Sequence, residues 1–109
     1  MKYKSVMQDL SERRCYLCAR LYGDETEKVN LHHHHVFSGP YKRASEKYGF
    51  IVTLCLYHHE GDITGNREAV HDAPNAKEYS DMLKRDAQKI FEQDHSRQEF
   101  IKIFGKSRL

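Results

Sequence analysis

The chain has 109 residues, of which 39% are hydrophobic and 31% charged, and its formal net charge is +2. A chain of this length is expected to form one domain with a modest core, which gains stability from a bound metal. Its beginning lacks the apolar region of a signal peptide, and no run of about 18 apolar residues follows, so secretion and membrane insertion are not expected. The weak positive charge permits DNA binding through a local basic patch but does not require it.

The first half of the chain contains two segments that favour β-strands. Residues 5–13 predict a short helix that precedes them. Residues 28–37 place valine, leucine and phenylalanine around four histidines, a composition compatible with a strand that ends at a Ser-Gly-Pro turn. Residues 41–48 suit a short helix closed by a glycine, and the β-branched run 50–54 then predicts the returning strand of a hairpin-like pair.

The second half of the chain is predicted to be mainly helical. A helix is expected to begin after Cys55, and the polar, glycine-containing residues 61–74 are expected to form a loop. Residues 75–94 repeat apolar side chains at intervals of three or four, which predicts an amphipathic helix. Ser96 and Glu99 form the ends of a capping box that opens a last helix.

Two C-x-x-[CH] pairs predict a zinc site. Cys15 and Cys18 can present two thiolates from one turn, and Cys55 and His58 repeat that spacing. Either pair alone would leave half of a tetrahedral shell to water, so zinc needs both pairs. The alternative is that the cysteines are buried, inert thiols. Because three cysteines cannot all pair as disulfides, a reducing cytosol fits this composition best.

The run from His32 to His35 supplies more imidazoles than the zinc site needs. On a strand, neighbouring side chains point to opposite faces, so all four histidines cannot join one site. A functional site requires two or three of them, with one imidazole binding a divalent metal and its neighbour deprotonating a water. His32 is expected to lie outside this site, and adventitious metal affinity at the surface is the alternative explanation for the run.

Further histidines follow in the second half of the chain. His59 comes directly after His58, and helical neighbours differ by about 100°, so it must face away from the zinc. It is expected to turn either toward the histidine strand or toward solvent. His71 is a weaker candidate for a further ligand, and His95 is expected to lie on the surface without a role.

The order of these pieces resembles the HNH, or His-Me finger, nucleases. The matching pieces are residues 31–37, with the sequence LHHHHVF, and residues 54–59, with the sequence LCLYHH. The runs HHVFSG, KYGFIVTLC and EFIKIFGK also resemble small phage and prophage HNH proteins that are related to phage recombination-enhancement nucleases. The resemblance covers about residues 15–104.

This resemblance implies a single α+β domain over residues 1–109. Its zinc-stabilised ββα-metal core, with a short β-hairpin, would span about residues 15–71, and amphipathic helices would follow at about residues 75–104. The implied location is the cytoplasm of a bacterial host, with the protein encoded by a phage or prophage.

The resemblance also implies roles for individual residues. His34 is expected to be the general base that activates water for in-line attack, with His33 as the metal-side member of the doublet. His35 is the alternative if the register is one residue later. His59 matches the helix ligand of a catalytic Mg²⁺ or Mn²⁺, and His71 completes or supports its shell. The residues that match the structural zinc set are Cys15, Cys18, Cys55 and His58.

One position departs from the family pattern. The middle asparagine of the family, which helps to hold the loop of the general base, is replaced here by Phe50. Another group must therefore orient His34, or the domain is a non-catalytic binder.

DNA is the expected partner, contacted mainly through its phosphates. Lys42, Arg43 and Lys47 closely follow the histidine run, and further cations lie near the end of the chain at Lys102, Lys106 and Arg108. A solvated helix face is the alternative explanation for these cations. No base-reading motif is present, so low sequence specificity is expected.

The expected activity is metal-dependent hydrolysis of DNA phosphodiester bonds, with a recombination protein as a further partner. One alternative is a non-catalytic zinc module that binds DNA or a recombination protein. Another is a protein that buffers or senses metal through its histidine run.

Overall fold

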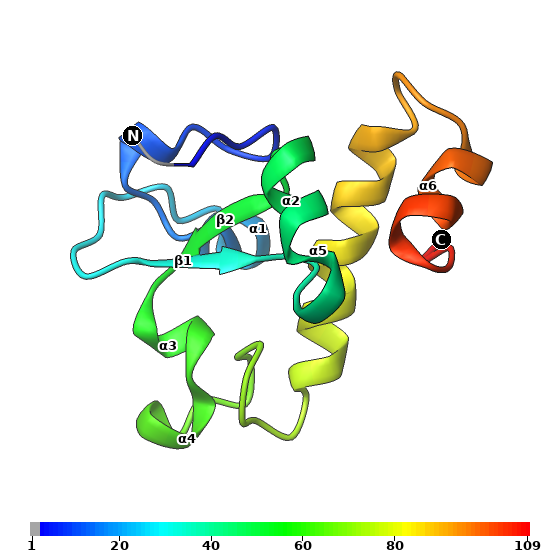
Figure 1. Cartoon of the computed structure of the whole chain (residues 1–109). Coiled ribbons are helices and arrows are strands. Elements are labelled where there is room, and N and C mark those ends of the chain that lie inside the picture. The colour runs from blue at the N-terminus through cyan, green and yellow to red at the C-terminus, as the bar shows by residue number, and fades with distance from the viewer. Residues whose placement is uncertain (1–2) are drawn as a thin grey trace.

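The computed structural model describes residues 3–109 as helices gathered around one small sheet (Figure 1). The predicted α+β class is confirmed. The elements in chain order are η1 (Leu10–Glu12), α1 (Tyr16–Tyr22), β1 (His32–His35), η2 (Gly39–Tyr41), α2 (Lys42–Tyr48), β2 (Ile51–Leu54), α3 (Leu56–His59), α4 (Gly61–Thr64), α5 (Ala76–Phe91) and α6 (Arg97–Phe104). Within residues 3–109, no helix has the length and apolar character needed to cross a membrane.

The sheet consists of β1 and β2, which pair antiparallel with His32 opposite Leu54 and His35 opposite Ile51. All four residues of β2 are buried, as its β-branched sequence favours. β1 is shorter than the predicted strand because Asn30 adopts a left-handed conformation, with φ of 57°, which interrupts extended backbone before His32. Helix α2 connects the two strands and confirms the prediction for residues 41–48.

The first regular helix begins later than predicted. Within residues 5–13 only the single 3-10 turn η1 forms, because Asp9 caps it and Arg13 ends it in a left-handed conformation with φ of 55°. The helix α1 begins instead after Cys15, whose sulfur accepts a hydrogen bond from the backbone N–H of Cys18. The first C-x-x-C pair therefore lies at a helix N-terminus.

The segment after α3 is more ordered than the predicted loop. It contains the short helix α4, and its chain then returns alongside α3. The backbone N–H of Gly61 donates a hydrogen bond of 2.9 Å to the carbonyl of His71. A Cβ at Gly61 would lie 2.6 Å from the Cβ of Ala73, so glycine is required at this close approach. The contact brings His71 back beside α3.

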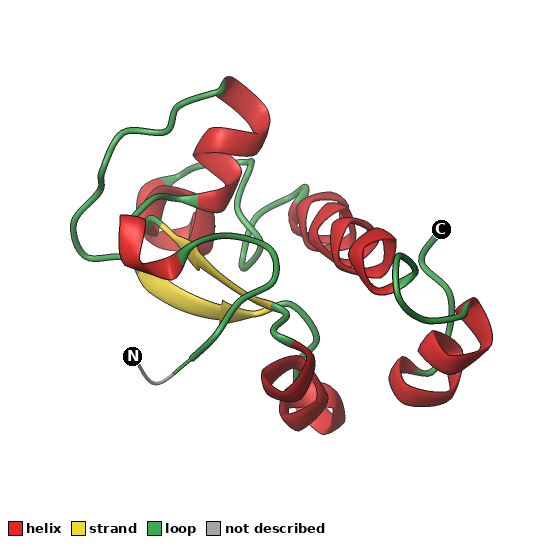
Figure 2. Ribbon diagram, turned by 90° about the horizontal axis from the view of Figure 1, so that it is seen from above, coloured by secondary structure: helices red, strands yellow, loops and turns green. Residues whose placement is uncertain are grey.

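Helices α5 and α6 lie side by side at one end of the molecule (Figures 1 and 2). Both agree with the prediction, including the capping box formed by Ser96 and Glu99. An aromatic core joins them to the hairpin, and its buried phenylalanines are Phe37, Phe50, Phe91, Phe100 and Phe104. Phe50 is 1% exposed, with its ring 5.6 Å from that of Phe104, so this position serves the core instead of carrying a polar amide.

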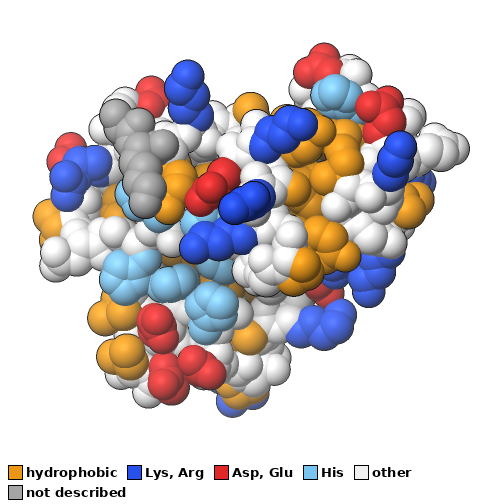
Figure 3. All heavy atoms as spheres, viewed as in Figure 1, with side chains coloured by type: hydrophobic (Ala, Val, Ile, Leu, Met, Phe, Trp, Pro, Cys, Tyr) orange, Lys and Arg blue, Asp and Glu red, His pale blue; other side chains and the backbone are white. Residues whose placement is uncertain are grey.

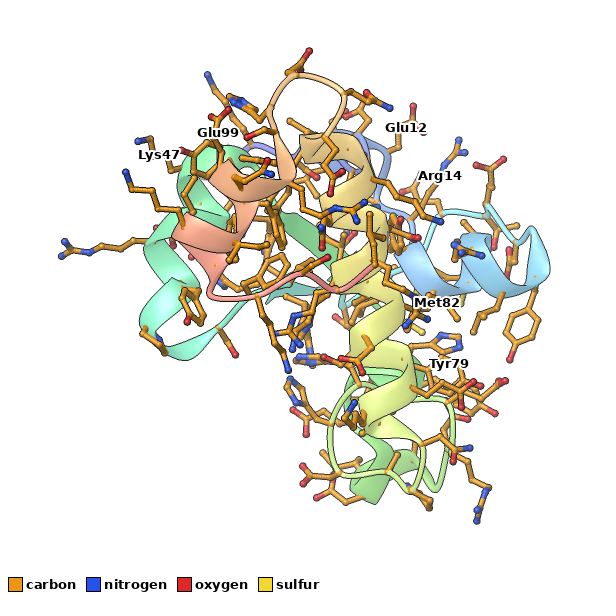
Figure 4. The ribbon with its side chains drawn as sticks, turned by 90° about the vertical axis from the view of Figure 1, so that its right-hand side faces the viewer. Glu12, Arg14, Lys47, Tyr79, Met82 and Glu99 are labelled. Carbon is orange, nitrogen blue, oxygen red and sulfur yellow. The ribbon has the colours of Figure 1, made fainter. Side chains whose placement is uncertain are left out.

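Helix α5 is also fixed to α1. The hydroxyl of Tyr16 donates a hydrogen bond of 2.7 Å to Asp86, and Nε of Arg20 lies 3.1 Å from the same carboxylate. Tyr79 and Met82 project from α5 toward the side on which α1 lies (Figure 4). The long helix therefore holds α1, and with it the first cysteine pair, against the sheet.

Candidate functional site

Cys15, Cys18, Cys55 and His58 lie close together and could bind a metal such as zinc. Nδ1 of His58 is 3.6 Å from Sγ of Cys15 and 3.4 Å from Sγ of both Cys18 and Cys55. The sulfurs of Cys18 and Cys55 are 3.8 Å apart. Tetrahedral zinc, with bonds of about 2.3 Å to sulfur and about 2.0 Å to nitrogen, separates its ligands by about 3.5–3.8 Å. The spacing of these donors therefore fits zinc.

The two halves of the cluster are built in the same way. Cys15 is the N-cap residue of α1, and Cys55 is the N-cap residue of α3. The second donor of each pair, Cys18 or His58, is the third residue of its helix. Side chains at these two positions meet across the first turn, which explains why the C-x-x-[CH] spacing gives two converging donors. The positive ends of both helices also favour thiolates.

Three thiols in one small space cannot all ionise without a cation between them. A hydrogen bond from Cys55 is the main cause that lowers the pKa of Cys15, and the same bond, followed by burial, raises the pKa of Cys55 to about 11. Burial is the main cause that raises the pKa of Cys18. A divalent ion would supply the positive charge that three thiolates need.

His34, His59 and His71 form a second cluster, in which one ring nitrogen of each lies within 4.8 Å of those of the other two. The ring centre of His34 is 5.7 Å from that of His59 and 5.3 Å from that of His71. The rings of His59 and His71 are 5.0 Å apart. A strand, a helix and the returning segment after α4 thus bring three imidazoles together.

His34 contributes a buried nitrogen that has no partner. The residue is 8% exposed, and within the described part of the chain its Nε2 finds no hydrogen-bond partner. Burial, followed by the charges of His71 and His59, lowers the pKa of His34 to about 3. An unsatisfied buried polar atom costs about 1–3 kcal/mol, so a lone-pair acceptor such as a metal ion fits this position.

The alternation of β1 determines which histidines reach this cluster. His33 and His35 lie beside Tyr3, whose ring centre is 5.3 Å from each imidazole. The structure therefore does not bring His33, the predicted metal-side residue, into this cluster. His33 is exposed on the other face of the strand, and His34 takes its place in the cluster.

His35 is paired with a carboxylate. Its Nε2 lies 2.9 Å from Oε1 of Glu46 in α2, and its side chain is 14% exposed. A carboxylate on one ring nitrogen fixes the orientation of the ring and leaves the other nitrogen, Nδ1, to accept a proton. The predicted base, His34, is instead enclosed within the histidine cluster.

His32, predicted to lie outside the site, contacts a member of the histidine cluster. Its Nδ1 is 2.7 Å from Nδ1 of His59. Two ring nitrogens at this distance share one proton, so the contact orients the ring of His59. The period of two along a strand was the signal that could have found this residue, because it places His32 on the same face as His34.

An acidic group that sequence reasoning missed lies beside the histidines. Glu60, Asp62 and Asp72 bring carboxylate oxygens within 4.8 Å of one another. Oε1 of Glu60 is 3.8 Å from Nδ1 of His59. Acidic side chains are visible directly below the pale blue histidines in Figure 3. One side of the histidine cluster is therefore negatively charged.

The predicted phosphate contacts lie on the other side of the hairpin. Lys42, Arg43 and Lys47 are all exposed and belong to α2, the helix that also carries Glu46. Lysine and arginine side chains border the histidines on the upper part of the face in Figure 3. Their position near His35 agrees with contact to a phosphate chain, and equally with a solvated helix face.

No family model, curated protein or solved structure matches this chain. Its chemistry therefore has to be inferred from its own donor groups. The first group has three thiols and one imidazole, which is enough to fill a tetrahedral shell. The second group has three imidazoles, which would leave positions for other ligands. The third is the pair of Glu46 and His35, which follows His34 in the sequence.

Proposed function

We propose that the protein is a zinc-stabilised, metal-dependent nuclease of the HNH type that hydrolyses phosphodiester bonds in DNA. The observation that carries this proposal is the convergence of His34, His59 and His71 beside the hairpin, including a buried ring nitrogen that no group within residues 3–109 satisfies. A purely structural site would close its shell, as the cysteine cluster does. The histidine set leaves ligand positions open for a water and a phosphate oxygen.

Cys15, Cys18, Cys55 and His58 have the structural role in this proposal. Structural zinc can contribute about 10 kcal/mol of folding free energy in a small domain. Here the ion would tie the start of α1 to the end of β2 and the start of α3. Because His59 follows His58 directly, the same turn that completes the zinc set also positions a histidine of the second site.

The histidine set favours some metals over others. Imidazole nitrogens suit divalent transition metals, whereas Mg²⁺ prefers oxygen ligands. Of the two ions predicted from the sequence, Mg²⁺ does not fit three imidazoles, and Mn²⁺, Co²⁺, Ni²⁺ or Zn²⁺ is the better choice. When bound, such an ion supplies positive charge to the scissile phosphate and its leaving oxygen.

We assign the role of general base to His35, the residue expected if the family register is one residue later than His34. The protein would use Glu46 to hold Nε2 of His35 and to stabilise the imidazolium after Nδ1 removes a proton from the attacking water. Within residues 3–109, β1 has β2 as its sole strand partner, so its outer edge is unpaired. The assignment requires a phosphate bound at that edge to contact both His34 and His35, whose rings lie on opposite faces of β1.

The assignment is tested by nicking of supercoiled plasmid with zinc-loaded protein and added Mn²⁺. His35→Ala should reduce the rate by about 10²–10⁴, the usual contribution of a general base. His33→Ala is the matched control, because it removes an imidazole from the same face of the same strand, and it should cleave like the wild type. Equal activity of the two variants would exclude His35 as the base.

The buried Phe50 favours a second candidate function. Because no asparagine is available at that position to hold the loop of the base, the domain could act as a zinc module that binds DNA or a recombination protein without cleaving. This candidate predicts DNA binding with no nicking under any divalent metal, in a protein that carries a full equivalent of zinc.

A further inference from the structure

A group of cations near the end of the chain lies beside the histidine site. Lys84 of α5 is partly buried, and within residues 3–109 it forms no hydrogen bond or ion pair. The positive charge of Lys84 is among the charges that act on His34. Lys84 is therefore a partly buried cation near His34 that has no partner among residues 3–109.

Arg108 lies next to Lys84 and is also poorly satisfied. Its side chain is 19% exposed, and Nη1 is 3.8 Å from Asp81, which is beyond hydrogen-bond distance. Its Nε is buried and finds no acceptor in the described chain. The guanidinium stands 6.0 Å from the ring centre of Phe37, two residues after His35. The backbone N–H of Arg108 donates to Oε1 of Gln88 at 2.7 Å, which fixes this segment on α5.

Positive charge exceeds negative charge around these two residues. The charges that act most on Lys84 are those of the cations Arg108, Lys106 and Lys77 and of the carboxylate of Asp81. Asp81 is already bound by Nζ of Lys77 at 2.7 Å. Burial is the main cause that lowers the pKa of Lys84, and repulsion from Arg108 is the next. Partly buried like charges are costly to the fold unless an anion accompanies them.

The charge on the two sides of the histidine site is therefore opposite. The acidic residues Glu60, Asp62 and Asp72 lie on the side of α3 and α4, whereas Lys84 and Arg108 lie on the side of α5. In Figure 1, α3 and α4 lie at the lower left of the molecule, and α5 lies to their right. A polyanion would be repelled by the first side and attracted by the second.

We propose that Lys84 and Arg108 form a phosphate-binding subsite that holds the backbone of a nucleic acid next to the histidine site. The proposal rests on the proposed function, because it names the contact that would position the substrate of that site. Ammonium and guanidinium groups with unused donors suit phosphate oxygens, and contacts of this kind position a nucleic acid without reading its sequence.

The test is the affinity of the full-length, zinc-loaded protein for a fluorescent DNA duplex, measured by anisotropy without added divalent metal. Lys84→Gln should weaken binding about tenfold and reduce the dependence of log affinity on log salt by about one unit. Lys84→Arg should restore most of the affinity. Lys89→Gln is the matched control, because Lys89 is exposed on the same helix, and it should bind like the wild type.

The melting temperature separates this role from a structural one. Lys84 has no partner to lose among the described residues, so Lys84→Gln should melt no lower than the wild type. Substitution of a structural lysine would lower the melting temperature. Arg108→Gln should also weaken DNA binding, but it loses packing on Phe37 as well, so Lys84→Gln is the decisive variant. Equal DNA affinity of Lys84→Gln and Lys89→Gln overturns the proposal, as does a wild type that does not bind DNA.

A competition experiment distinguishes a DNA phosphate from free phosphate. Inorganic phosphate should displace the duplex only at millimolar concentrations, because it offers a single phosphate. Displacement at micromolar concentrations would assign the subsite to free phosphate and overturn the DNA assignment. If a duplex binds through Lys84 but is not cleaved with Mn²⁺, the result supports the phosphate-binding subsite and excludes the proposed nuclease activity. If Lys84→Gln cleaves DNA and binds it like the wild type, the result excludes the subsite but agrees with the proposed nuclease activity.

Discussion

His33 and His34 are neighbours with the same side chain, yet they lie on opposite faces of β1. His34→Ala removes an imidazole from the histidine cluster, so Co²⁺ or Mn²⁺ should bind the zinc-loaded protein at least about tenfold more weakly. Isothermal titration with each ion measures this change. His33→Ala should bind metal like the wild type. Equal weakening in both variants would contradict the claim that strand alternation places His34, but not His33, in the metal-binding cluster.

The buried ring of His34 should also make stability depend on pH. Burial and the charges of His71 and His59 lower the pKa of His34 to about 3 in the folded state, whereas an unfolded histidine titrates near 6.5. Because the unfolded chain takes up the proton at higher pH, this stabilisation is fully present above about pH 6.5 and is lost as the pH falls toward 3.

Urea unfolding of zinc-loaded protein, without a second metal, measures this effect. The free energy of unfolding should decrease as the pH is lowered from about 7 to about 5.5. His34→Phe keeps a ring at the position but cannot take up a proton, so its decrease should be smaller. The same slope in both proteins would mean that His34 is not held neutral by the fold.

At the scale of the elements, the short helix α3 carries two adjacent histidines that we assign to different sites. His58→Ala opens the cysteine cluster and should lower both the zinc content and the melting temperature strongly. His59→Ala removes a ligand of the histidine site alone, so zinc content should stay at one equivalent and the melting temperature should change little. If the two substitutions lower the melting temperature equally, both residues serve one structural site.

The second strand begins beside Phe50, where the nuclease pattern has an asparagine. Phe50→Asn removes a buried ring and leaves an amide among Phe37, Phe91 and Phe104, so it should cost at least about 3 kcal/mol. Chemical unfolding measures this loss, and Phe50→Leu, which keeps an apolar side chain, should lose clearly less. A stable Phe50→Asn protein with raised nuclease activity would instead show that the core can accept the family residue.

Much of the fold was predictable because local sequence signals agreed with the final packing. The two C-x-x-[CH] pairs, the β-branched run of β2 and the capping box of α6 each specify their own geometry within a few residues. The helix predicted at residues 5–13 failed because Asp9 and Arg13 stop it after one turn, and neither the apolar pattern nor composition reveals a left-handed residue.

The candidate site was less predictable, since it depends on contacts between distant residues. His71 reaches His34 only because Gly61 allows the returning segment to approach α3 closely. The position of Arg108 near Lys84 likewise depends on the docking of the chain end on α5 through Gln88. In contrast, the pairing of His32 with His34 on one face could have been predicted from strand alternation alone.

At the scale of the whole molecule, two groups of side chains within one contiguous core hold the helices on the small sheet. The cysteine cluster ties α1 and α3 to β2, and the aromatic core ties α5 and α6 to the other end of the hairpin. Chelation of zinc should therefore release α1 and α3 from the cysteine cluster and lower the melting temperature by more than about 10 °C. A calorimetric scan with and without a strong chelator measures this. An unchanged melting temperature, with zinc shown to be absent, would exclude a structural zinc.

The most direct measurement is the nicking of supercoiled plasmid by zinc-loaded protein during a titration with Mn²⁺, compared with His59→Ala. We expect relaxed circles to form only with the added metal, and His59→Ala to lose at least about a hundredfold in rate while it keeps its zinc and its melting temperature. Absence of nicking with Mn²⁺, Co²⁺, Ni²⁺ and excess Zn²⁺, or full activity of His59→Ala, would contradict a phosphodiester-cleaving histidine site in this protein.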